Sequence, residues 1–127
     1  MTNYKPMVYI CSPYAGDVES NIEKARRYSR FAVESGCIPI APHLLFPQFM
    51  SEKDERDEAM HMNLVLLGKC SELWVFVETI TKGMGVEIRK AKFWHKPIRY
   101  FDENCEEGSI ETTLGRIQLG GHNNVSR

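Results

Sequence analysis

Long hydrophobic runs, an excess of charge of one sign and closely spaced cysteines are all missing from this 127-residue sequence. Spanning a bilayer takes roughly 20 consecutive apolar residues, and no stretch approaches that length, so we expect no membrane-spanning segment. The polar first residues precede only a short apolar run that ends near Cys11, which lacks the length and cleavage pattern of a signal peptide. We therefore expect a cytoplasmic protein with no membrane partner.

The charges are nearly balanced, with 16 Lys and Arg against 17 Asp and Glu and a formal net charge of -1. Proteins that bind nucleic-acid polymers usually carry a basic excess or stripe, because neutralising phosphates drives their affinity. The longest basic cluster here is only Lys24, Arg26 and Arg27. The composition therefore argues against a nucleic-acid polymer as partner and favours a small charged metabolite.

The 4 cysteines are far apart and form no C-x-x-C pair, so neither zinc-site spacing nor a small disulfide scaffold is indicated. Their expected state is reduced and mostly buried. The 4 histidines likewise show no spacing suited to a set of metal ligands. We expect neither a metal ion nor another cofactor.

Short apolar, β-branched or aromatic runs alternate with segments of helical periodicity. The runs cover residues 7–11, 37–41, 73–77 and 98–101 and predict buried strands. The first helical segment starts at Asp17 or Ser20, either of which can cap it, and ends near Gly36. The other helical segments cover about residues 55–70 and 85–95, the last ended by the Lys96-Pro97 step.

This alternation predicts a three-layer α/β fold: an open, mostly parallel sheet of about four or five strands, with helices on both faces, of the flavodoxin or Rossmann type. A fifth strand, if there is one, is expected within residues 109–119, although Ile110, Leu114 and Ile117 recur there at helical rather than strand spacing. Typical domains run about 100–150 residues, so we expect a single domain over residues 1–127. Its core would occupy about 7–101 and a C-terminal extension 102–127, of which residues 120–127 would be disordered or reach a neighbouring subunit.

In an open parallel sheet, ligands bind beyond the carboxyl ends of the strands, which directs attention to the loops there. The loop after the first strand enters a helix, so its backbone N–H groups are candidates for cradling a phosphate, although a plain tight turn has the same composition. It holds Ser12, Pro13, Tyr14, Ala15, Gly16 and Asp17. His43 follows the second strand among apolar neighbours, where an imidazole either bonds a base or sugar or has a structural role. Met60, Trp74 and Trp94 are expected to be packing residues.

The loop after the third strand leads into Gly83, Met84 and Gly85, followed by Glu87. This run begins like a dinucleotide-binding fingerprint, but Ile88 replaces the last small residue and no Walker-type ending follows. We expect Glu87 in the first turn of the third helix, where the helix dipole favours an ionised carboxylate. Such a carboxylate, preceded by glycines that let a ligand approach, is a candidate nucleophile. The alternative is an exposed side chain that merely complements the dipole.

Several short motifs, taken in their order along the chain, resemble the nucleoside 2-deoxyribosyltransferase superfamily. They are Val8-Tyr9-Ile10-Cys11-Ser12-Pro13-Tyr14, the helix at Asn21, Ile40-Ala41-Pro42-His43, Glu72-Leu73-Trp74-Val75-Phe76 and Gly83-Met84-Gly85-Val86-Glu87-Ile88. The resemblance covers about residues 7–101. It is strongest to a branch of small deoxyribosyltransferase-like proteins, related to the 2′-deoxynucleoside 5′-monophosphate N-glycosidases.

The resemblance implies an enzyme that cleaves or exchanges the N-glycosidic bond of a small nucleoside or nucleoside 5′-monophosphate. Glu87 corresponds to the nucleophile that forms a glycosyl-enzyme, and Tyr9 to the tyrosine that orients this carboxylate. Residues 12–16 correspond to the loop that holds the sugar or 5′-phosphate, Thr81 to a phosphate-contacting hydroxyl, and His43 to a position near the base. A homo-oligomer, dimeric or larger, is also implied, because relatives complete their pockets with residues of a neighbouring subunit.

One position departs from the family pattern, since Asn63 stands where these enzymes carry a functional aspartate. An amide donates and accepts hydrogen bonds but does not exchange a proton at neutral pH. Either another group, such as Asp17 or His61, supplies the acid–base function, or the protein binds nucleotides with little turnover. A catalytically weak or inactive nucleotide-binding or signalling module on the same fold is therefore the alternative function.

Overall fold

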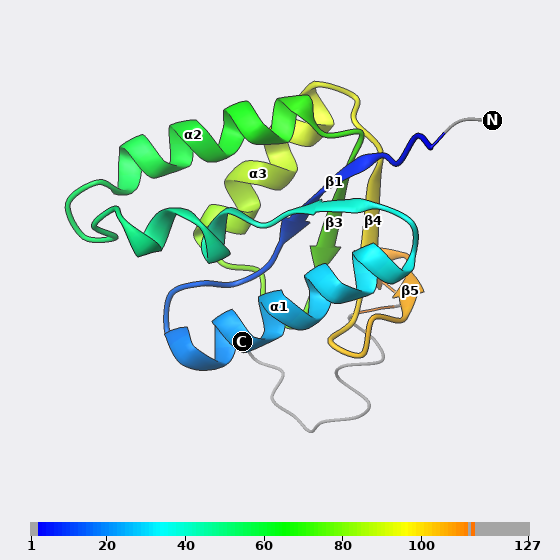
Figure 1. Ribbon diagram of the computed structural model, residues 1–127, viewed down its shortest axis with the longest axis horizontal. Helices are drawn as coiled ribbons and strands as arrows, with labels where there is room; N and C mark the ends of the chain where they lie inside the picture. Colours follow the sequence, from blue (N-terminus) through cyan, green and yellow to red (C-terminus); the bar gives the residue numbers. More distant parts are fainter. Residues whose placement is uncertain (1–2, 112, 114–127) are drawn as a thin grey trace.

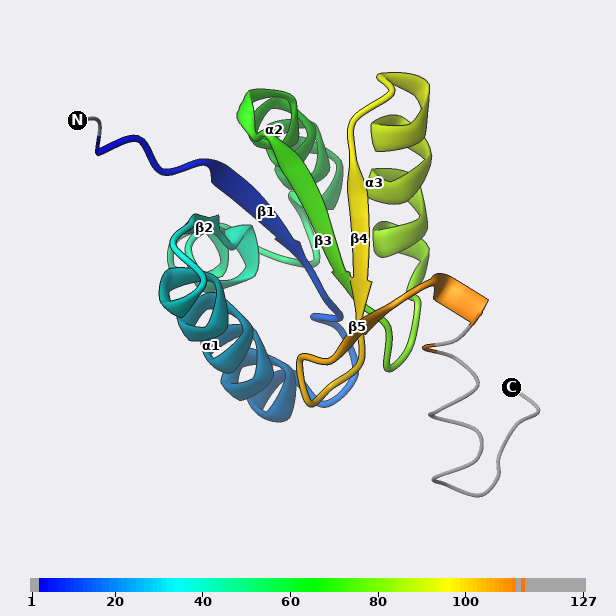
Figure 2. The same ribbon diagram turned by 90° about the vertical axis from the view of Figure 1, so that its right-hand side faces the viewer.

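The computed structural model describes residues 3–111 and residue 113 of the chain. Its centre is an open sheet in which β1, β3, β4 and β5 follow one another (Figure 1) and β2 lies beside β1 at the edge (Figure 2), in the order β2-β1-β3-β4-β5. The strands are β1 (Met7–Cys11), β2 (Ile38–Ile40), β3 (Glu72–Phe76), β4 (Ile98–Phe101) and β5 (Glu107–Gly108). All pairings are parallel except that of β4 with β5. The predicted open, mostly parallel sheet is confirmed, and Pro39 lies in the edge strand β2, where a missing N–H is tolerated.

Helices cover both faces of this sheet, which gives the predicted three layers (Figure 2). They are α1 (Val18–Glu34), α2 (Arg56–Lys69) and α3 (Lys82–Phe93). The 3-10 turns η1 (Pro42–Leu44) and η2 (Phe46–Gln48) lie between β2 and α2. Helix α1 packs on one face, whereas α2 and α3 pack on the other.

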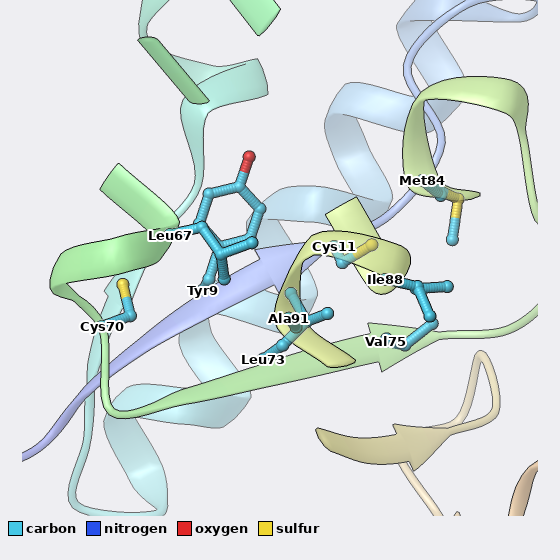
Figure 3. Packing of buried hydrophobic residues seen from close by; sticks show 9 residues of the cluster. All are labelled: Tyr9, Cys11, Leu67, Cys70, Leu73, Val75, Met84, Ile88 and Ala91. Atoms are coloured by element: carbon cyan, nitrogen blue, oxygen red, sulfur yellow. The ribbon is translucent and has the colours of Figure 1, made fainter. Parts of the chain in front are cut away.

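The alternation of side chains along β1 divides the core between the two faces. Val8 and Ile10 point to the α1 side, where they join a buried cluster rich in aromatic rings. Tyr9 and Cys11 point to the α2–α3 side, where they pack with Met84 and other apolar residues of the two helices (Figure 3). Both faces of β1 are therefore buried: Val8 and Ile10 pack against aromatic rings, and Tyr9 and Cys11 pack against the two helices.

The start of α3 differs from the prediction, because the helix begins at Lys82 and not at residue 85. Thr81 caps it: its side chain accepts a hydrogen bond from the Met84 N–H at 3.2 Å, while the Met84 sulfur accepts one from the Thr81 N–H at 3.5 Å. A thioether here takes the place of the Glu or Gln that signals such a cap in a sequence. Glu87 consequently lies in the second turn of α3, and the prediction that placed it in the first turn is wrong.

The ends of α1 agree with the sequence, because Asp17 caps its start by accepting a hydrogen bond from the Ser20 N–H at 3.3 Å. Gly36 follows its end with a φ of +83°, a conformation that favours glycine. The fifth strand, β5, precedes the segment 109–119 in which it was expected, so that prediction is wrong. The expectation for residues 120–127 falls outside the described residues.

The remaining global expectations concern membranes and cysteines. Within the described part of the chain, no helix combines the length and apolarity that crossing a membrane requires. The cysteines are free thiols, of which Cys11 and Cys70 are buried and Cys37 and Cys105 partly buried.

Candidate functional site

A cavity of about 370 Å³ is lined by the segments that follow β1, β2 and β3, together with the starts of α2 and α3. β1 and β3 are neighbours, but β1 leads into α1 on one face and β3 leads into α3 on the other. Such a reversal opens a crevice at the carboxyl ends of the strands, which is where open α/β sheets bind ligands. The fold therefore creates the cavity where the sequence predicted a site.

The structure brings together only part of the predicted site. The predicted residues that line the cavity are Tyr14, His43, Asn63, Thr81, Gly83, Met84 and Glu87. Tyr9 lies behind this wall, where its hydroxyl donates a hydrogen bond to Glu87 Oε2 at 2.6 Å. The segments that follow three strands, together with the helices α2 and α3, thus surround the cavity that the Glu87 side chain lines.

Glu87 is only 2% exposed and lies among uncharged groups. The Tyr9 hydroxyl donates a hydrogen bond to it, and the Cys11 thiol and the Asn63 amide lie beside it, where they lower its pKa. Tyr9 and Cys11 reach Glu87 from the same face of β1, and Asn63 reaches it from α2. The carboxyl group is therefore flanked from two elements, and none of these three groups carries a positive charge.

Burial raises the pKa of Glu87 to about 7, although Tyr9, Cys11 and Asn63 each lower it. Burial also raises the pKa values of Tyr9 and Cys11 well above their usual range, so both keep their protons and remain donors. The expectation of a carboxylate kept ionised by the helix start is wrong, because Glu87 lies deeper in the helix and is desolvated. Near neutral pH the group is divided between its two protonation states.

Asn63 is 6% exposed and lines the same cavity. Its Oδ1 atom has no hydrogen-bond partner among the described residues. The substitutes expected for the missing aspartate are not at the cavity: Asp17 caps α1, and His61 is exposed on α2. Two carboxylates that the sequence did not single out, Glu52 and Asp57, do line it.

The loop after β1 contributes less than predicted. The Asn21 amide donates hydrogen bonds of 3.0 Å to the carbonyl groups of Tyr14 and Ala15, which fixes these two residues at the cavity wall. The structure places the other loop residues outside the wall: Ser12, Pro13, Gly16 and Asp17. Helix α1 starts directly after Asp17, so this part of the loop turns away into the cap.

The glycines before Glu87 have different surroundings. A Cβ atom at Gly83 would lie 3.4 Å from the Met60 methyl group, at the cavity. A Cβ atom at Gly85 would instead lie 3.3 Å from Arg89, and Gly85 does not line the cavity. Met60, predicted to be a packing residue, is part of the wall. Of these two glycines, Gly83 is therefore the one that a ligand in the cavity would meet.

Aromatic and apolar residues form another part of the cavity wall. The ring centroids of Tyr14 and His43 lie 5.1 Å apart, and burial lowers the pKa of His43, which favours its neutral form. The wall also contains Phe46, Pro47 and Met50, to which the sequence analysis gave no individual role. They lie in the irregular stretch after β2, where no periodic pattern marks them.

The mouth of the cavity holds both signs of charge. Arg56 and Lys82 line it together with Glu52 and Asp57, and Arg56 pairs with Glu52 at 3.5 Å. No group of at least 3 His, Cys, Asp or Glu residues in the described ranges is placed to hold a metal ion.

A family model with the description "Domain of unknown function (DUF7768)" matches residues 6–101. The chain belongs to the DUF7768 family. No curated protein matches the sequence. Among solved structures, this DUF7768 chain is similar to a 2-deoxyribosyltransferase from Leishmania mexicana, with a TM-score of 0.54 and 13% identity. The match covers 76% of this chain and 64% of that one. The predicted deoxyribosyltransferase-like fold is confirmed.

Proposed function

We propose that this protein cleaves or exchanges the N-glycosidic bond of a small nucleoside or nucleoside 5′-monophosphate, with Glu87 as the nucleophile. One observation carries the proposal: a carboxyl group that is 2% exposed lines a cavity of about 370 Å³ and is oriented by the Tyr9 hydroxyl at 2.6 Å. A cavity of this size is typical of small-molecule sites. The activity named for the similar enzyme from Leishmania mexicana supports sugar-transfer chemistry.

The reaction has two displacement steps at the anomeric carbon, C1′. In the first, a Glu87 oxygen bonds to C1′ while the C1′–N bond breaks, and the base leaves with the electron pair and takes a proton from water. In the second, water or another base attacks C1′, which releases Glu87 as a carboxylate. With water, the products are the free sugar and a proton. A carboxylate suits both steps because the transition state carries positive charge on the sugar.

The uncharged surroundings of Glu87 favour this role. The Tyr9 hydroxyl holds the carboxylate in position, and the neutral Cys11 and Asn63 lie beside it, so no group neutralises it as a neighbouring Lys or Arg would. Desolvation leaves its charge poorly compensated, so the positive charge that develops on the sugar stabilises the site. The pKa of about 7 means that a substantial fraction is ionised and reactive at neutral pH.

The walls suggest how the rest of a nucleotide would lie. The apolar side formed by His43, Phe46 and Met50 is suited to a base, and Arg56 and Lys82 at the mouth are suited to a 5′-phosphate. The homo-oligomer expected from the sequence stays a prediction.

The test is release of free base from the common ribonucleosides, 2′-deoxynucleosides and their 5′-monophosphates, with and without an added acceptor base. We expect base release from at least one compound and a loss of about 10³-fold or more in Glu87→Gln, as for the removal of other covalent nucleophiles. Glu58→Gln, which changes an exposed carboxyl on α2 outside the cavity wall, is the matched control and should retain full activity. No free base from any compound, or full activity in Glu87→Gln, would contradict the proposal.

A non-catalytic nucleotide-binding module is the second candidate, and Asn63 favours it. With an amide in place of the family aspartate, a site can hold a nucleotide without supplying a proton to the departing base. Tight binding without turnover in the wild-type protein, and no activity gained in Asn63→Asp, would favour this function.

A further inference from the structure

Methionine is concentrated around the cavity. Of the 6 methionines in the sequence, Met50, Met60 and Met84 line the wall, and they come from three separate parts of the chain. A methionine side chain is unbranched and rotates about three bonds, so it adapts to neighbours of different shape. Its sulfur also makes favourable contacts with aromatic rings. Such a wall suits flat ligands of more than one size.

Two of these methionines differ in how firmly they are held. Met84 is 1% exposed, and its sulfur accepts a hydrogen bond from the Thr81 N–H at 3.5 Å. Met60 is only partly buried, and its methyl group lies opposite Gly83, where a Cβ atom would be 3.4 Å away. Because Gly83 has no side chain, the end of Met60 has room to turn toward α3.

The contact between Met60 and Gly83 lies one helical turn from the carboxyl group. On α3, Gly83 precedes Glu87 by four residues, and both line the cavity. On α2, Met60 precedes Asn63 by three residues, and both line it as well. One turn measures about 5.4 Å, so a base attached to C1′ beside Glu87 comes level with this contact. The apolar side chain of Met60 suits a base and not a phosphate.

We propose that Met60 is a movable wall of the base site, which turns toward Gly83 to admit the two-ring base of a purine nucleotide and turns back to cover the single ring of a pyrimidine. The cavity then takes both classes of base, and Met60 determines the balance between them. The inference rests on the proposed function, because the place of the base follows from attack by Glu87 at C1′.

The test changes the two sides of the contact separately. Gly83→Ala adds a methyl group 3.4 Å from the end of Met60 and so fills the space into which it turns. The position lies within α3, where alanine is favourable. Met60→Ala removes the movable side chain. The matched controls are Gly85→Ala on α3 and Met62→Ala on α2, both outside the cavity wall.

Each variant is assayed on the 5′-monophosphates of adenine and cytosine nucleosides with the same sugar. Because the two N-glycosidic bonds differ in intrinsic stability, each compound is compared with itself across the variants. Wild type should cleave both, with kcat/KM values within about 100-fold. Gly83→Ala should lower kcat/KM about tenfold more for the adenine compound, the effect of overfilling a packed site. Met60→Ala should instead lower it about threefold more for the cytosine compound, through loss of a thioether–ring contact.

The double variant shows whether both changes act on one contact. In Met60→Ala the added methyl group has nothing to obstruct, so Gly83→Ala should cause no further change in the ratio of the two compounds. Gly85→Ala and Met62→Ala should keep the wild-type ratio. The inference is overturned if Gly83→Ala lowers both compounds equally, if its effect on the ratio persists in the double variant, or if wild type cleaves only one class of base. If Met60→Ala does not fold, Gly83→Ala alone decides.

Failure of the proposed function is distinguished by binding. The same nucleotides are titrated by calorimetry into Glu87→Gln, with and without Gly83→Ala. If no compound is cleaved but both nucleotides bind and Gly83→Ala weakens only the adenine compound, the inference stands without the nucleophile. If base is released but the ratio does not respond to Gly83→Ala, the proposed function stands and the inference fails. Binding of only one of the two nucleotides, or of neither, also overturns it.

Discussion

The two faces of the sheet differ in what they bury. On the α1 side, aromatic rings stack in a closed cluster: the ring centroids of Tyr28 and Phe76 lie 4.0 Å apart and those of Phe76 and Phe101 lie 5.0 Å apart. On the α2–α3 side, an apolar cluster also surrounds the buried Glu87 and opens to a cavity. Residues of one strand, β1, enter both. The comparison shows that stability and chemistry are separated across the thickness of a single sheet.

The separation has an energetic basis. Close-packed rings stabilise the fold through area removed from water and through ring contacts. A buried carboxyl group without a cation does the opposite, because its charged form loses hydration that neutral donors replace only in part. Residues on the α1 side should therefore change stability without changing activity, and residues around Glu87 should change activity and stability in opposite directions.

The largest stability effect is expected on the α1 side, for Phe76→Ala. Phe76 is fully buried, and removing such a ring costs about 3–5 kcal/mol of unfolding free energy. Denaturant unfolding measures the loss, and base release per folded molecule should remain near the wild-type rate because Phe76 does not line the cavity. If the folded Phe76→Ala variant lost as much activity as Glu87→Gln, the separation of stability and chemistry between the two faces would be contradicted.

For Glu87→Gln we expect a somewhat smaller change in the unfolding free energy, and at high pH this change is a gain in stability relative to wild type. Because folding raises the pKa of Glu87 from 4.5 to about 7, the folded protein binds more protons than the unfolded chain between these pH values. The contribution of Glu87 is therefore fully present below about pH 4.5 and is lost as the pH rises through 7. We expect wild type to lose about 3 kcal/mol relative to Glu87→Gln between pH 4 and pH 9. Unfolding across this range measures it; the Glu58→Gln control should track wild type.

The smallest expected effect is a change in kcat/KM when a buried tyrosine loses its hydroxyl. We compare Tyr9 on the α2–α3 side with Tyr28 on the α1 side. Tyr9→Phe removes a hydrogen bond that lowers the pKa of Glu87, so less of the group is ionised at pH 7. We expect kcat/KM to fall about tenfold at pH 7, and by less at pH 9. Tyr28→Phe is the matched control, because the Tyr28 hydroxyl is buried without a partner in the described structure. Equal pH profiles for wild type and Tyr9→Phe would contradict the role given to Tyr9.

The sheet was predictable because each of its parallel strands is a short apolar run between turn residues. The start of α3 was not, since glycines at 83 and 85 mark a loop in sequence and the cap uses a methionine sulfur. β5 spans only Glu107–Gly108 and leaves no alternating pattern. Tyr9, Asn63 and Glu87 were predicted as a set only through the family resemblance.

Properties of the site that depend on tertiary packing could not be read from the sequence. The pKa of Glu87 follows from burial by two helices and a strand that are distant along the chain. Phe46, Pro47 and Met50 lie between β2 and α2 and form part of the cavity wall only once the chain is folded. The one usable signal in the sequence was the run of apolar residues directly after the second strand, a run that also contains His43.

The central claim is that the α2–α3 face holds a buried carboxyl group with no cation beside it. The most direct test is a titration of the glutamate side-chain carboxyl carbons by carbon-13 NMR in wild type and Glu87→Gln. One resonance should titrate near pH 7 in wild type and be missing from Glu87→Gln. If every glutamate resonance of the wild type titrates below about pH 5, Glu87 is not the desolvated group described, and the account is contradicted.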